Sequence, residues 1–283
     1  MSMSSETATQ VAREYYNSSD ADQFYSEIWG GEDIHIGLYE SEDEPIKDAS
    51  RRTVDHLLER IGELNQHSTV IDVGSGYGGA ARRMVERLGC RVVCVNLSET
   101  ENARNRRLNE QAGLADRIDV VDGSFEELPF EGGRFDAAWS QDAILHAGNR
   151  PRVLGEVDRV LKPGGRFVFT DPMQSNDCPS GVLDHILARI HLADLGSPKS
   201  YQGVARDLGW RDLGFEDLTD QLVNHYSRVL RVTEDRQPDL SGKISDEYLE
   251  RMKSGLRHWV DGGRKGYLSW GVFLFGKPFR PAD

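Results

Sequence analysis

Short β-branched runs alternate with helical stretches through the middle of this 283-residue chain, and that alternation constrains the fold more than any other feature. Strand-like runs include TVIDV at 69–73, RVVCVNL at 91–97 and RFVFTDP at 166–172. The helical stretches between such runs lie at 79–88, 99–112 and 150–161. Strands that alternate with helices of about 10–15 residues predict a parallel sheet, because each helix carries the chain back across the sheet. We therefore expect an α/β fold.

The pattern changes on both sides of this region, which divides the chain into four expected segments. Residues 1–65 are polar and helix-like and predict an N-terminal helical cap. Residues 66–175 carry the alternating pattern and predict the core, whereas 176–245 are interpreted as an insertion that covers a site. Residues 246–283 predict a helix and then an apolar strand, GYLSWGVFLFGKP, which completes the core sheet.

Bulk properties disfavour several classes of protein. No apolar run approaches the roughly 20 residues that span a bilayer, and the N-terminal MSMSSETATQ lacks the basic and apolar regions of a secretory signal. We therefore expect a cytoplasmic protein with no membrane partner. Cys90, Cys94 and Cys178 are too few and too scattered to suggest a disulfide framework or a metal site.

The chain is strongly acidic, with 47 aspartate and glutamate residues against 34 lysine and arginine residues and a formal net charge of −13. Such an average field repels DNA and RNA, so we expect no nucleic-acid partner. We interpret the excess acidity as an adaptation to high salt, which is a hypothesis about stability and solubility.

A glycine-rich loop, VIDVGSGYGG, follows the first predicted strand and opens a helix. Gly74, Gly76 and Gly79 satisfy G-x-G-x-x-G, a pattern that equally suits a dinucleotide-dependent oxidoreductase or a tight turn that binds nothing. Asp72, just before the glycines, would repel a pyrophosphate and attract an ammonium group. Asn96 occupies the strand end where dinucleotide-binding proteins carry an acid for the ribose, and its amide can still bind hydroxyls.

Residues 65–175 resemble a class I S-adenosylmethionine-dependent methyltransferase, which implies a Rossmann-like α/β fold with a mostly parallel seven-stranded sheet and flanking helices. Asp72–Gly79 is similar to the first motif of that family. VVDGSFEELPF at 120–130 resembles its adenine-binding segment, with Ser124 where the family often has aspartate. FDAAWSQDAILHAGN at 135–149 resembles the motif beneath the methionine end of the cofactor.

A narrower resemblance starts at SQDAILHA, 140–147, which is similar to the sarcosine/dimethylglycine N-methyltransferases of glycine betaine synthesis. DPMQSNDCPSGVL, RIHLADLGS and NHYSRV extend this likeness over most of the chain. It implies that methyl groups pass from S-adenosylmethionine to sarcosine or dimethylglycine, in a monomer or homodimer, with S-adenosylhomocysteine as product. Another acceptor, such as phosphoethanolamine or a natural product, is the main alternative, since S-x-D-A-I-L-H also occurs in phosphoethanolamine methyltransferases. Two further alternatives are a dinucleotide-dependent oxidoreductase and a catalytically silent scaffold that only binds the cofactor.

The resemblance also implies site residues. The catalytic pair would be His146 and an N-terminal tyrosine, Tyr16 or its neighbour Tyr15. Expected cofactor contacts are Tyr25, Gly37, Asp72, Gly74, Ser75, Gly76, Asn96, Leu97, Gly123, Ser124, Phe125, Gln141 and His146. Expected acceptor contacts are Gln141, Met173, Arg189, Tyr201 and Tyr226. Further candidates for the acceptor carboxylate are His191, His225 and Arg228, and aromatic faces for a quaternary ammonium are available at Tyr25, Trp29, Tyr39, Trp139, Trp259 and Trp270.

Methyl transfer from a sulfonium to an amine is an in-line displacement, so alignment and exclusion of water matter most. An amine with a pKa of about 10 is mostly protonated at neutral pH, and burial beside the sulfonium lowers that pKa. We expect His146 to take the remaining proton, directly or through water; a purely structural histidine at a helix start is the alternative. EDIHIGLY places His35 and Gly37 in a lid over the cofactor, with Gly30 and Gly31 as its hinge, or in ordinary helix packing.

Overall fold

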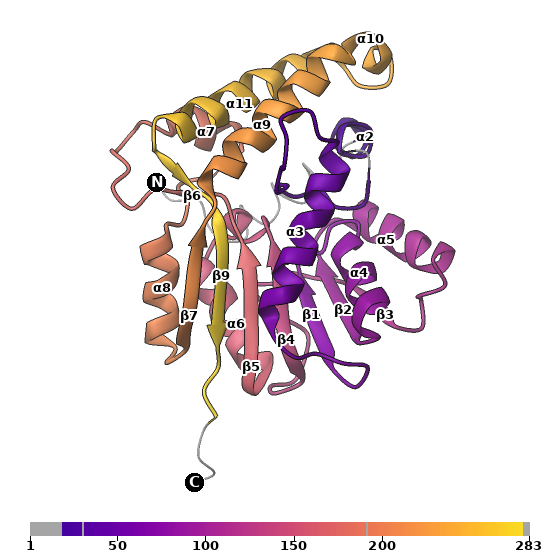
Figure 1. Cartoon of the computed structure of the whole chain (residues 1–283), viewed down its shortest axis with the longest axis vertical. Helices are drawn as coiled ribbons and strands as arrows, with labels where there is room; N and C mark the ends of the chain where they lie inside the picture. The colour runs from indigo at the N-terminus through magenta and orange to yellow at the C-terminus, as the bar shows by residue number, and fades with distance from the viewer. Residues whose placement is uncertain (1–18, 30, 191, 280–283) are drawn as a thin grey trace.

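The computed structural model describes residues 19–29, 31–190 and 192–279, so the expected catalytic Tyr16 and the candidate His191 lie outside the described residues. Seven strands form the central sheet in the order β3-β2-β1-β4-β5-β9-β7 (Figure 1). Neighbouring strands are parallel except that β9 runs antiparallel to both β5 and β7. The strands are β1 Thr69–Val73, β2 Arg91–Asn96, β3 Ile118–Asp122, β4 Phe135–Gln141, β5 Leu161–Thr170, β7 Arg211–Asp217 and β9 Gly271–Gly276. The expected mostly parallel seven-stranded sheet is confirmed.

Helices cover both faces of this sheet, and most of them turn an apolar stripe toward it, whereas α5 buries polar side chains instead. On one face Leu57 of α3 and Met84 of α4 pack with Val92 and Trp139 in one core cluster. On the other face Val157 of α6 and Tyr201 of α8 pack with a group of buried phenylalanines from β5 and β9. The helices of these two layers are α3 Ile46–Ile61, α4 Gly79–Leu88, α5 Glu99–Gln111, α6 Arg150–Val160 and α8 Pro198–Asp207.

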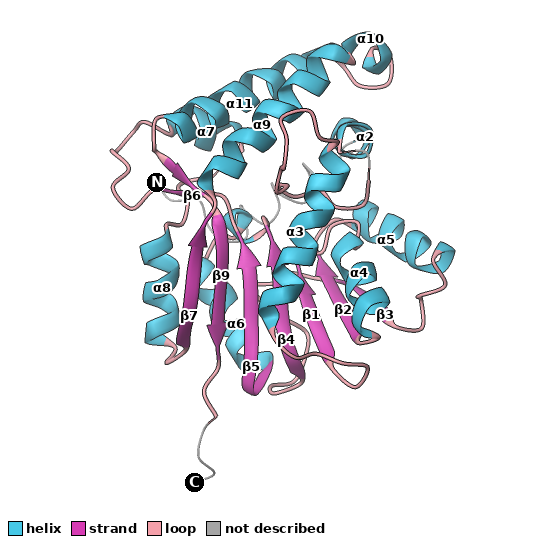
Figure 2. Ribbon diagram, in the orientation of Figure 1, coloured by secondary structure: helices cyan, strands magenta, loops and turns pink. Residues whose placement is uncertain are grey.

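A further layer lies above the carboxyl ends of the parallel strands (Figure 2). Its main part is the pair α9 and α11, which run side by side, with Phe24 of α2 and Leu249 of α11 in a shared apolar cluster. The elements of this layer are α2 Ser19–Ile28, η1 Ile144–His146, α7 Asp184–Arg189, α9 Thr219–Asp235, α10 Gln237–Leu240 and α11 Asp246–Arg264, with β6 Met173–Gln174 paired to β8 Leu268–Ser269. None of the described helices is long and apolar enough to cross a membrane.

The expected insertion 176–245 is interrupted in the structure by a strand of the core. β7, at Arg211–Asp217, pairs along β9 and forms the edge of the central sheet. The layer over the strand ends is therefore built from two separate pieces, one before β7 and one after it. The second piece continues into α11, the helix of the predicted 246–283 segment.

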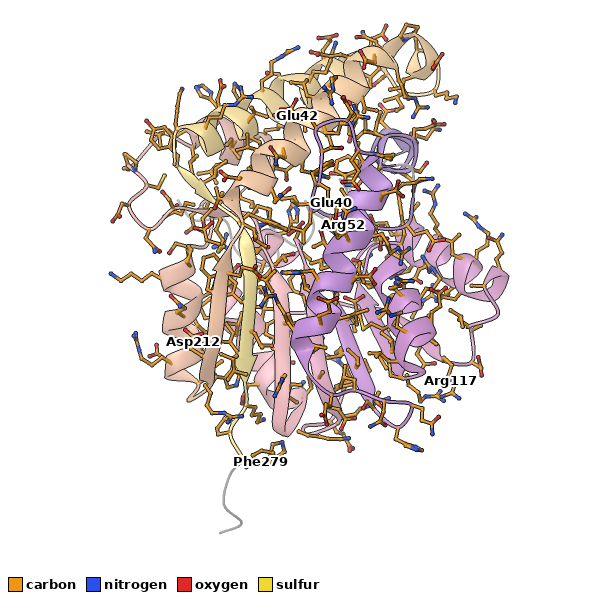
Figure 3. All side chains as sticks on the ribbon, in the orientation of Figure 1. Glu40, Glu42, Arg52, Arg117, Asp212 and Phe279 are labelled. Atoms are coloured by element: carbon orange, nitrogen blue, oxygen red, sulfur yellow. The ribbon has the colours of Figure 1, made fainter. Side chains whose placement is uncertain are left out.

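The loop between α2 and α3 is held against α3. Leu38 donates its backbone N–H to the carbonyl of Ala49 at 3.0 Å. Arg52 of α3 forms ion pairs with Glu44 at 2.5 Å and Glu40 at 3.4 Å, and Figure 3 shows Glu40 and Arg52 near one another. These contacts fix the loop over the strand ends, where its residues 32–36 border the cavity described next.

Candidate active site

A cavity opens at the carboxyl ends of β1, β2 and β4, beneath α9 and α11. Open α/β sheets bind ligands at this edge, where the strand order reverses. Of the expected site residues, those that line the cavity are Tyr25, Asp72, Gly74, Ser75, Gly76, Asn96, Leu97, Phe125, Gln141, His146, Arg189 and Tyr226. The glycine loop, the 140–147 segment and α7 thus meet in one place.

The glycine loop brings backbone, rather than side chains, to the cavity. Gly74, Gly76 and Gly78 have φ values of +81°, +50° and +74°, a region that favours glycine. A Cβ on Gly74 would lie 2.3 Å from the Cβ of Ala143, and one on Gly79 would lie 2.2 Å from an oxygen of Asp33. The loop is therefore a cradle into which only glycine fits.

Asp72 is a buried carboxyl, 2% exposed, at the end of β1. No ion pair joins it to a cation among residues 19–29, 31–190 and 192–279. Burial raises its pKa to about 7, while His35 acts to lower that pKa and the nearby Asp33 to raise it. A carboxyl held in this way favours a ligand that brings a positive charge.

Asn96 and Glu101 form a pair on the next part of the wall. Asn96, at the end of β2, donates its Nδ2 proton to Oε2 of Glu101 at 2.8 Å. Glu101 lies in the first turn of α5, is 4% exposed and lines the cavity. Burial raises the pKa of Glu101 to about 7. The sequence pointed to Asn96 here, but not to the acid five residues later.

Phe125 is the residue of the 123–125 segment that reaches the cavity. Gly123 donates its N–H to the carbonyl of Asn96 at 3.1 Å, and the Ser124 hydroxyl accepts the N–H of Glu126 at 3.1 Å. The expected contacts at Gly123 and Ser124 are thus not brought to the cavity wall, since these residues hold the turn behind Phe125.

The 140–147 segment supplies the floor at the end of β4. Gln141 accepts a hydrogen bond from the Trp139 indole at 3.0 Å, while its own Nε2 has no partner among the described residues. Asp142 has φ +52°, and its carboxylate accepts from the N–H of Ile36 at 2.7 Å and the Trp270 indole at 2.8 Å. A non-glycine residue at such a φ is strained, and the strain is retained because Asp142 ties the N-terminal loop to the floor.

His146 follows in the 3₁₀ turn η1, and burial lowers its pKa to about 4, with Arg150 and Arg189 contributing. The imidazole is therefore neutral at physiological pH and can accept a proton. Asp171 fixes this turn: its carboxylate accepts hydrogen bonds from the Leu145 N–H at 2.9 Å and from the Tyr201 hydroxyl at 2.6 Å.

Two expected acceptor contacts lie elsewhere. Tyr201 is buried behind η1 and acts on it through Asp171 instead of reaching the cavity. Met173 is fully buried in the core, because β6 pairs with β8 and turns it inward, and its neighbour Pro172 lines the cavity. Arg228 donates to the carbonyls of Asp43 and Glu44 and so braces the N-terminal loop.

Arg189, at the end of α7, lies against α11 and lines the cavity. A Cβ on Gly255 would lie 1.9 Å from Nε of Arg189, so the arginine rests directly on the helix backbone. Its Nη2 contacts the sulfur of Met252 at 3.3 Å, and its buried Nε has no hydrogen-bond partner in residues 19–29, 31–190 and 192–279. No carboxylate of the described chain forms an ion pair with it, which leaves a cation directed at the cavity.

The N-terminal loop and α9 close the remaining side. Gly37 does not reach the cavity: it packs on Ala49 and donates its N–H to Nδ1 of His225 at 3.2 Å. The Tyr39 hydroxyl lies 3.0 Å from the same nitrogen. Because Nδ1 accepts the Gly37 N–H, the proton of the neutral ring is on Nε2, which is buried without a partner in the described part of the chain. Burial lowers the pKa of His225 to about 3.

Five ring-bearing cavity residues form a continuous aromatic belt. Ring centroids lie 4.9 Å apart for Tyr25 and Trp29, 5.4 Å for Trp29 and His225, 5.4 Å for His225 and Tyr226, and 5.2 Å for Tyr226 and Trp259. All five line the cavity. Of the other aromatic candidates, Trp139 and Trp270 are fully buried and Tyr39 faces His225.

Comparison with known proteins agrees with this arrangement. A family described as a methyltransferase domain matches residues 71–169. A sarcosine/dimethylglycine N-methyltransferase of Halorhodospira halochloris is 54% identical over 95% of this chain and 97% of its own length. A dimethylglycine N-methyltransferase of Parasynechococcus marenigrum is 51% identical over 96% and 97%. A crystal structure assigned as a sarcosine dimethylglycine methyltransferase, from Galdieria sulphuraria, superposes with a TM-score of 0.89 at 42% identity, over 94% of this chain and 100% of that one.

Proposed function

Because this chain belongs to the sarcosine/dimethylglycine N-methyltransferase family, we propose that it methylates the amines of sarcosine and dimethylglycine to give glycine betaine. The observation that carries the proposal is identity of 54% to such an enzyme over nearly the whole of both chains. Family membership also decides against the dinucleotide-dependent oxidoreductase, which fitted the glycine loop alone. The enzyme depends on S-adenosylmethionine.

The residues at the strand ends fit S-adenosylmethionine. The buried Asp72 has no cation partner in the described chain and suits the cofactor's ammonium. A Cβ on Gly74, Gly78 or Gly79 would clash with a neighbouring residue, so the loop can bring its backbone close to the cofactor at these positions. Phe125 and Leu97 offer apolar surface for the adenine. When bound, this cofactor supplies an electrophilic methyl group on a positively charged sulfur.

Arg189 is the residue we propose for the carboxylate of the acceptor. It is a partly buried cation without an ion-pair partner in the described chain, and its Nε lacks a hydrogen bond. A guanidinium binds a carboxylate with two parallel hydrogen bonds, which fixes orientation as well as position. Met252 and the backbone at Gly255 hold the guanidinium in place.

The aromatic belt is the surface we propose for the methylated nitrogen. A methylammonium group is attracted to the faces of Trp and Tyr rings, and the attraction increases when water is excluded. His225 adds no competing positive charge, because it stays neutral at physiological pH. Trp29 and Trp259 lie toward opposite ends of the belt, so the nitrogen meets rings from two elements.

His146 is the residue we propose as proton acceptor. Its neutral form predominates above pH 4 because burial and the two neighbouring arginines lower its pKa to about 4. Burial and those two cations also destabilise the imidazolium, so a proton taken by His146 is held only weakly. This assigns chemistry to His146 beyond that of a structural residue at the start of a turn.

A panel of acceptors tests the proposal. The purified protein, S-adenosylmethionine and one of glycine, sarcosine, dimethylglycine or phosphoethanolamine are mixed, and formation of S-adenosylhomocysteine is measured. We expect turnover with sarcosine and dimethylglycine. Turnover with phosphoethanolamine alone would move the chain to the alternative acceptor class. Binding of S-adenosylhomocysteine with no turnover on any acceptor would indicate a silent scaffold.

Variants then test the roles of single residues. His146→Ala should bind S-adenosylhomocysteine as the wild type does and lower kcat by roughly 100-fold or more, the range of general base catalysis. Arg189→Gln should raise the KM for dimethylglycine about 10–100-fold, the effect of losing hydrogen bonds to a charged group. Arg206→Gln, at an arginine 81% exposed on α8, is the matched control and should change neither constant.

A further inference from the structure

Two consecutive acids of the N-terminal loop rest on the end of the glycine loop. A Cβ on Gly79 would clash with a carboxylate oxygen of Asp33 and with the backbone carbonyl of Glu32. All three residues line the cavity. The N-terminal loop and the glycine loop are therefore two walls of one cavity, and they touch where α4 begins.

Arg82 of α4 joins the first of these acids to the glycine loop. Its Nε donates to Oε2 of Glu32 at 2.7 Å, and its Nη2 donates to the backbone carbonyl of Tyr77 at 2.6 Å. Its Nη1 donates to Oδ1 of Asn109 at 2.7 Å, so α5 also holds the guanidinium. Arg82 is 3% exposed, and the rigid fork of a buried guanidinium fixes the groups that it binds.

Arg51 of α3 makes a second bridge of the same form. Its Nε lies 2.9 Å from Oδ2 of Asp33, and its Nη1 donates to the backbone carbonyl of Gly79 at 3.3 Å. Each arginine thus binds one acid of the N-terminal loop and one carbonyl of the glycine loop. Among the described residues, those that line the cavity include neither arginine, so both act on a ligand through other residues.

We propose that Arg51 and Arg82 are positioning residues for S-adenosylmethionine, because they hold the two walls at a fixed separation around the cofactor. Partly buried ion pairs of this kind are screened less by water and salt than surface pairs. Breaking either bridge frees the N-terminal wall and admits water to the site. Since changes within one binding site act mainly on dissociation, S-adenosylhomocysteine should then leave faster.

A neighbouring ion pair supplies the matched control. Arg83, the next residue of α4, donates two hydrogen bonds to Asp55 of α3, at 2.7 and 2.8 Å. This pair also joins α3 to α4, but neither residue borders the cavity in the described chain. Its loss should lower stability without changing cofactor binding.

The test measures the affinity for S-adenosylhomocysteine by calorimetry and its dissociation rate by surface plasmon resonance. The proteins are the wild type, Glu32→Gln, Arg51→Gln, Arg51→Lys and Asp55→Asn, and their melting temperatures are recorded without ligand. No acceptor is present, so the result does not depend on which amine the enzyme methylates.

We expect Glu32→Gln and Arg51→Gln each to weaken binding about 10-fold, mostly through faster dissociation. A direct effect of charge on the ammonium group of the ligand would instead act in opposite directions, since one variant removes an acid and the other removes a base. Arg51→Lys keeps the charge but lacks the planar fork, so it should lie between the wild type and Arg51→Gln.

Asp55→Asn should lower the melting temperature and bind the ligand as the wild type does. Wild-type affinity and dissociation rate in either Glu32→Gln or Arg51→Gln would overturn the proposal, as would tighter binding by Arg51→Gln. An equally large change in Asp55→Asn would also overturn it, because the effect would then follow from a general loss of stability.

Discussion

At the scale of single residues, the cavity concentrates groups that the folded chain leaves unsatisfied. Within the part of the chain that the structure describes, buried polar atoms without a hydrogen-bond partner occur on several cavity residues, namely Asp33, His35, Gln141, Arg189 and His225. Each such atom costs free energy of folding, about 1–3 kcal/mol when fully buried. A ligand that satisfies them recovers this free energy as binding, so the unliganded protein should gain stability when these groups are removed.

Asp72→Asn tests a related cost, that of burying a carboxylate charge in the empty site. Burial raises the pKa of Asp72 to about 7, so the folded protein binds this proton more tightly than the unfolded chain does. Stability contributed by the proton is therefore lost as pH rises from about 4 to 7 and is absent above pH 7. Without ligand, Asp72→Asn should melt about 2 °C or more above the wild type at pH 8, with a smaller difference at pH 5.

The same variant should bind S-adenosylhomocysteine more weakly, because it lacks the charge that faces the ammonium group. Thermal melts without this ligand give the stability of the empty protein, and melts at increasing ligand concentration give its affinity for S-adenosylhomocysteine. A lower melting temperature than the wild type at pH 8 would show that Asp72 stabilises the empty site, contrary to the expectation.

At the scale of elements, the acceptor side depends on how α7 rests on α11. Gly255 leaves room for Arg189, since a Cβ there would lie 1.9 Å from Nε of the arginine. Glycine inside a helix is unfavourable by about 1 kcal/mol relative to alanine, so its presence in α11 has a local stability cost. The glycine in turn allows the Arg189 side chain to lie directly against the backbone of α11.

Gly255→Ala should therefore separate stability from acceptor binding. Helix propensity favours the variant, whereas the new methyl group displaces Arg189 from the cavity wall. We expect an unchanged or slightly higher melting temperature, unchanged affinity for S-adenosylhomocysteine, and a KM for dimethylglycine raised about 10-fold, as for partial loss of a charged hydrogen bond. Ser254→Ala, one residue earlier and exposed, is the control. An unchanged KM in Gly255→Ala would remove Arg189 from the proposed acceptor site.

Parts of the site that lie on one short segment of the chain were predictable from the sequence, whereas parts that depend on contacts between distant elements were not. The glycine loop and the 140–147 segment were predictable because strand, turn and catalytic side chain follow one another within a few residues. Glu101 was not predictable as a cavity residue, because its place in the wall depends on a side-chain contact with Asn96 at the start of α5. Met252 was not predicted, because it reaches the cavity only where α11 packs on α9 above the sheet, a long-range arrangement without a local signal. Trp259 was one of six aromatic candidates, and the same packing decides that it lines the cavity while Trp139 does not. A strand at Phe215–Leu218, which overlaps β7, is predictable from the sequence, but its place at the edge of the central sheet is not, because its pairing with β9 joins distant segments.

At the scale of the whole molecule, the net charge of −13 opposes folding through mutual repulsion of surface carboxylates. Salt screens this repulsion, but it also weakens the many arginine–carboxylate pairs on the surface, such as Arg83 with Asp55 and Arg257 with Glu234. Exposed pairs contribute only about 0–1 kcal/mol each. We expect the relief of repulsion to exceed the loss from these pairs at neutral pH.

The melting temperature at pH 7.5 should accordingly rise by several degrees between about 10 mM and 500 mM NaCl, as the screening length falls from about 30 Å to a few Å. The sequence pI of about 5.1 supplies an internal control. At that pH the net charge vanishes while many ion pairs persist, so added salt should leave the melting temperature unchanged or lower it. An equal rise at both pH values would point to a general salt effect on apolar burial rather than to charge. No rise at pH 7.5 would mean that the acidic surface is not an adaptation of stability to high salt.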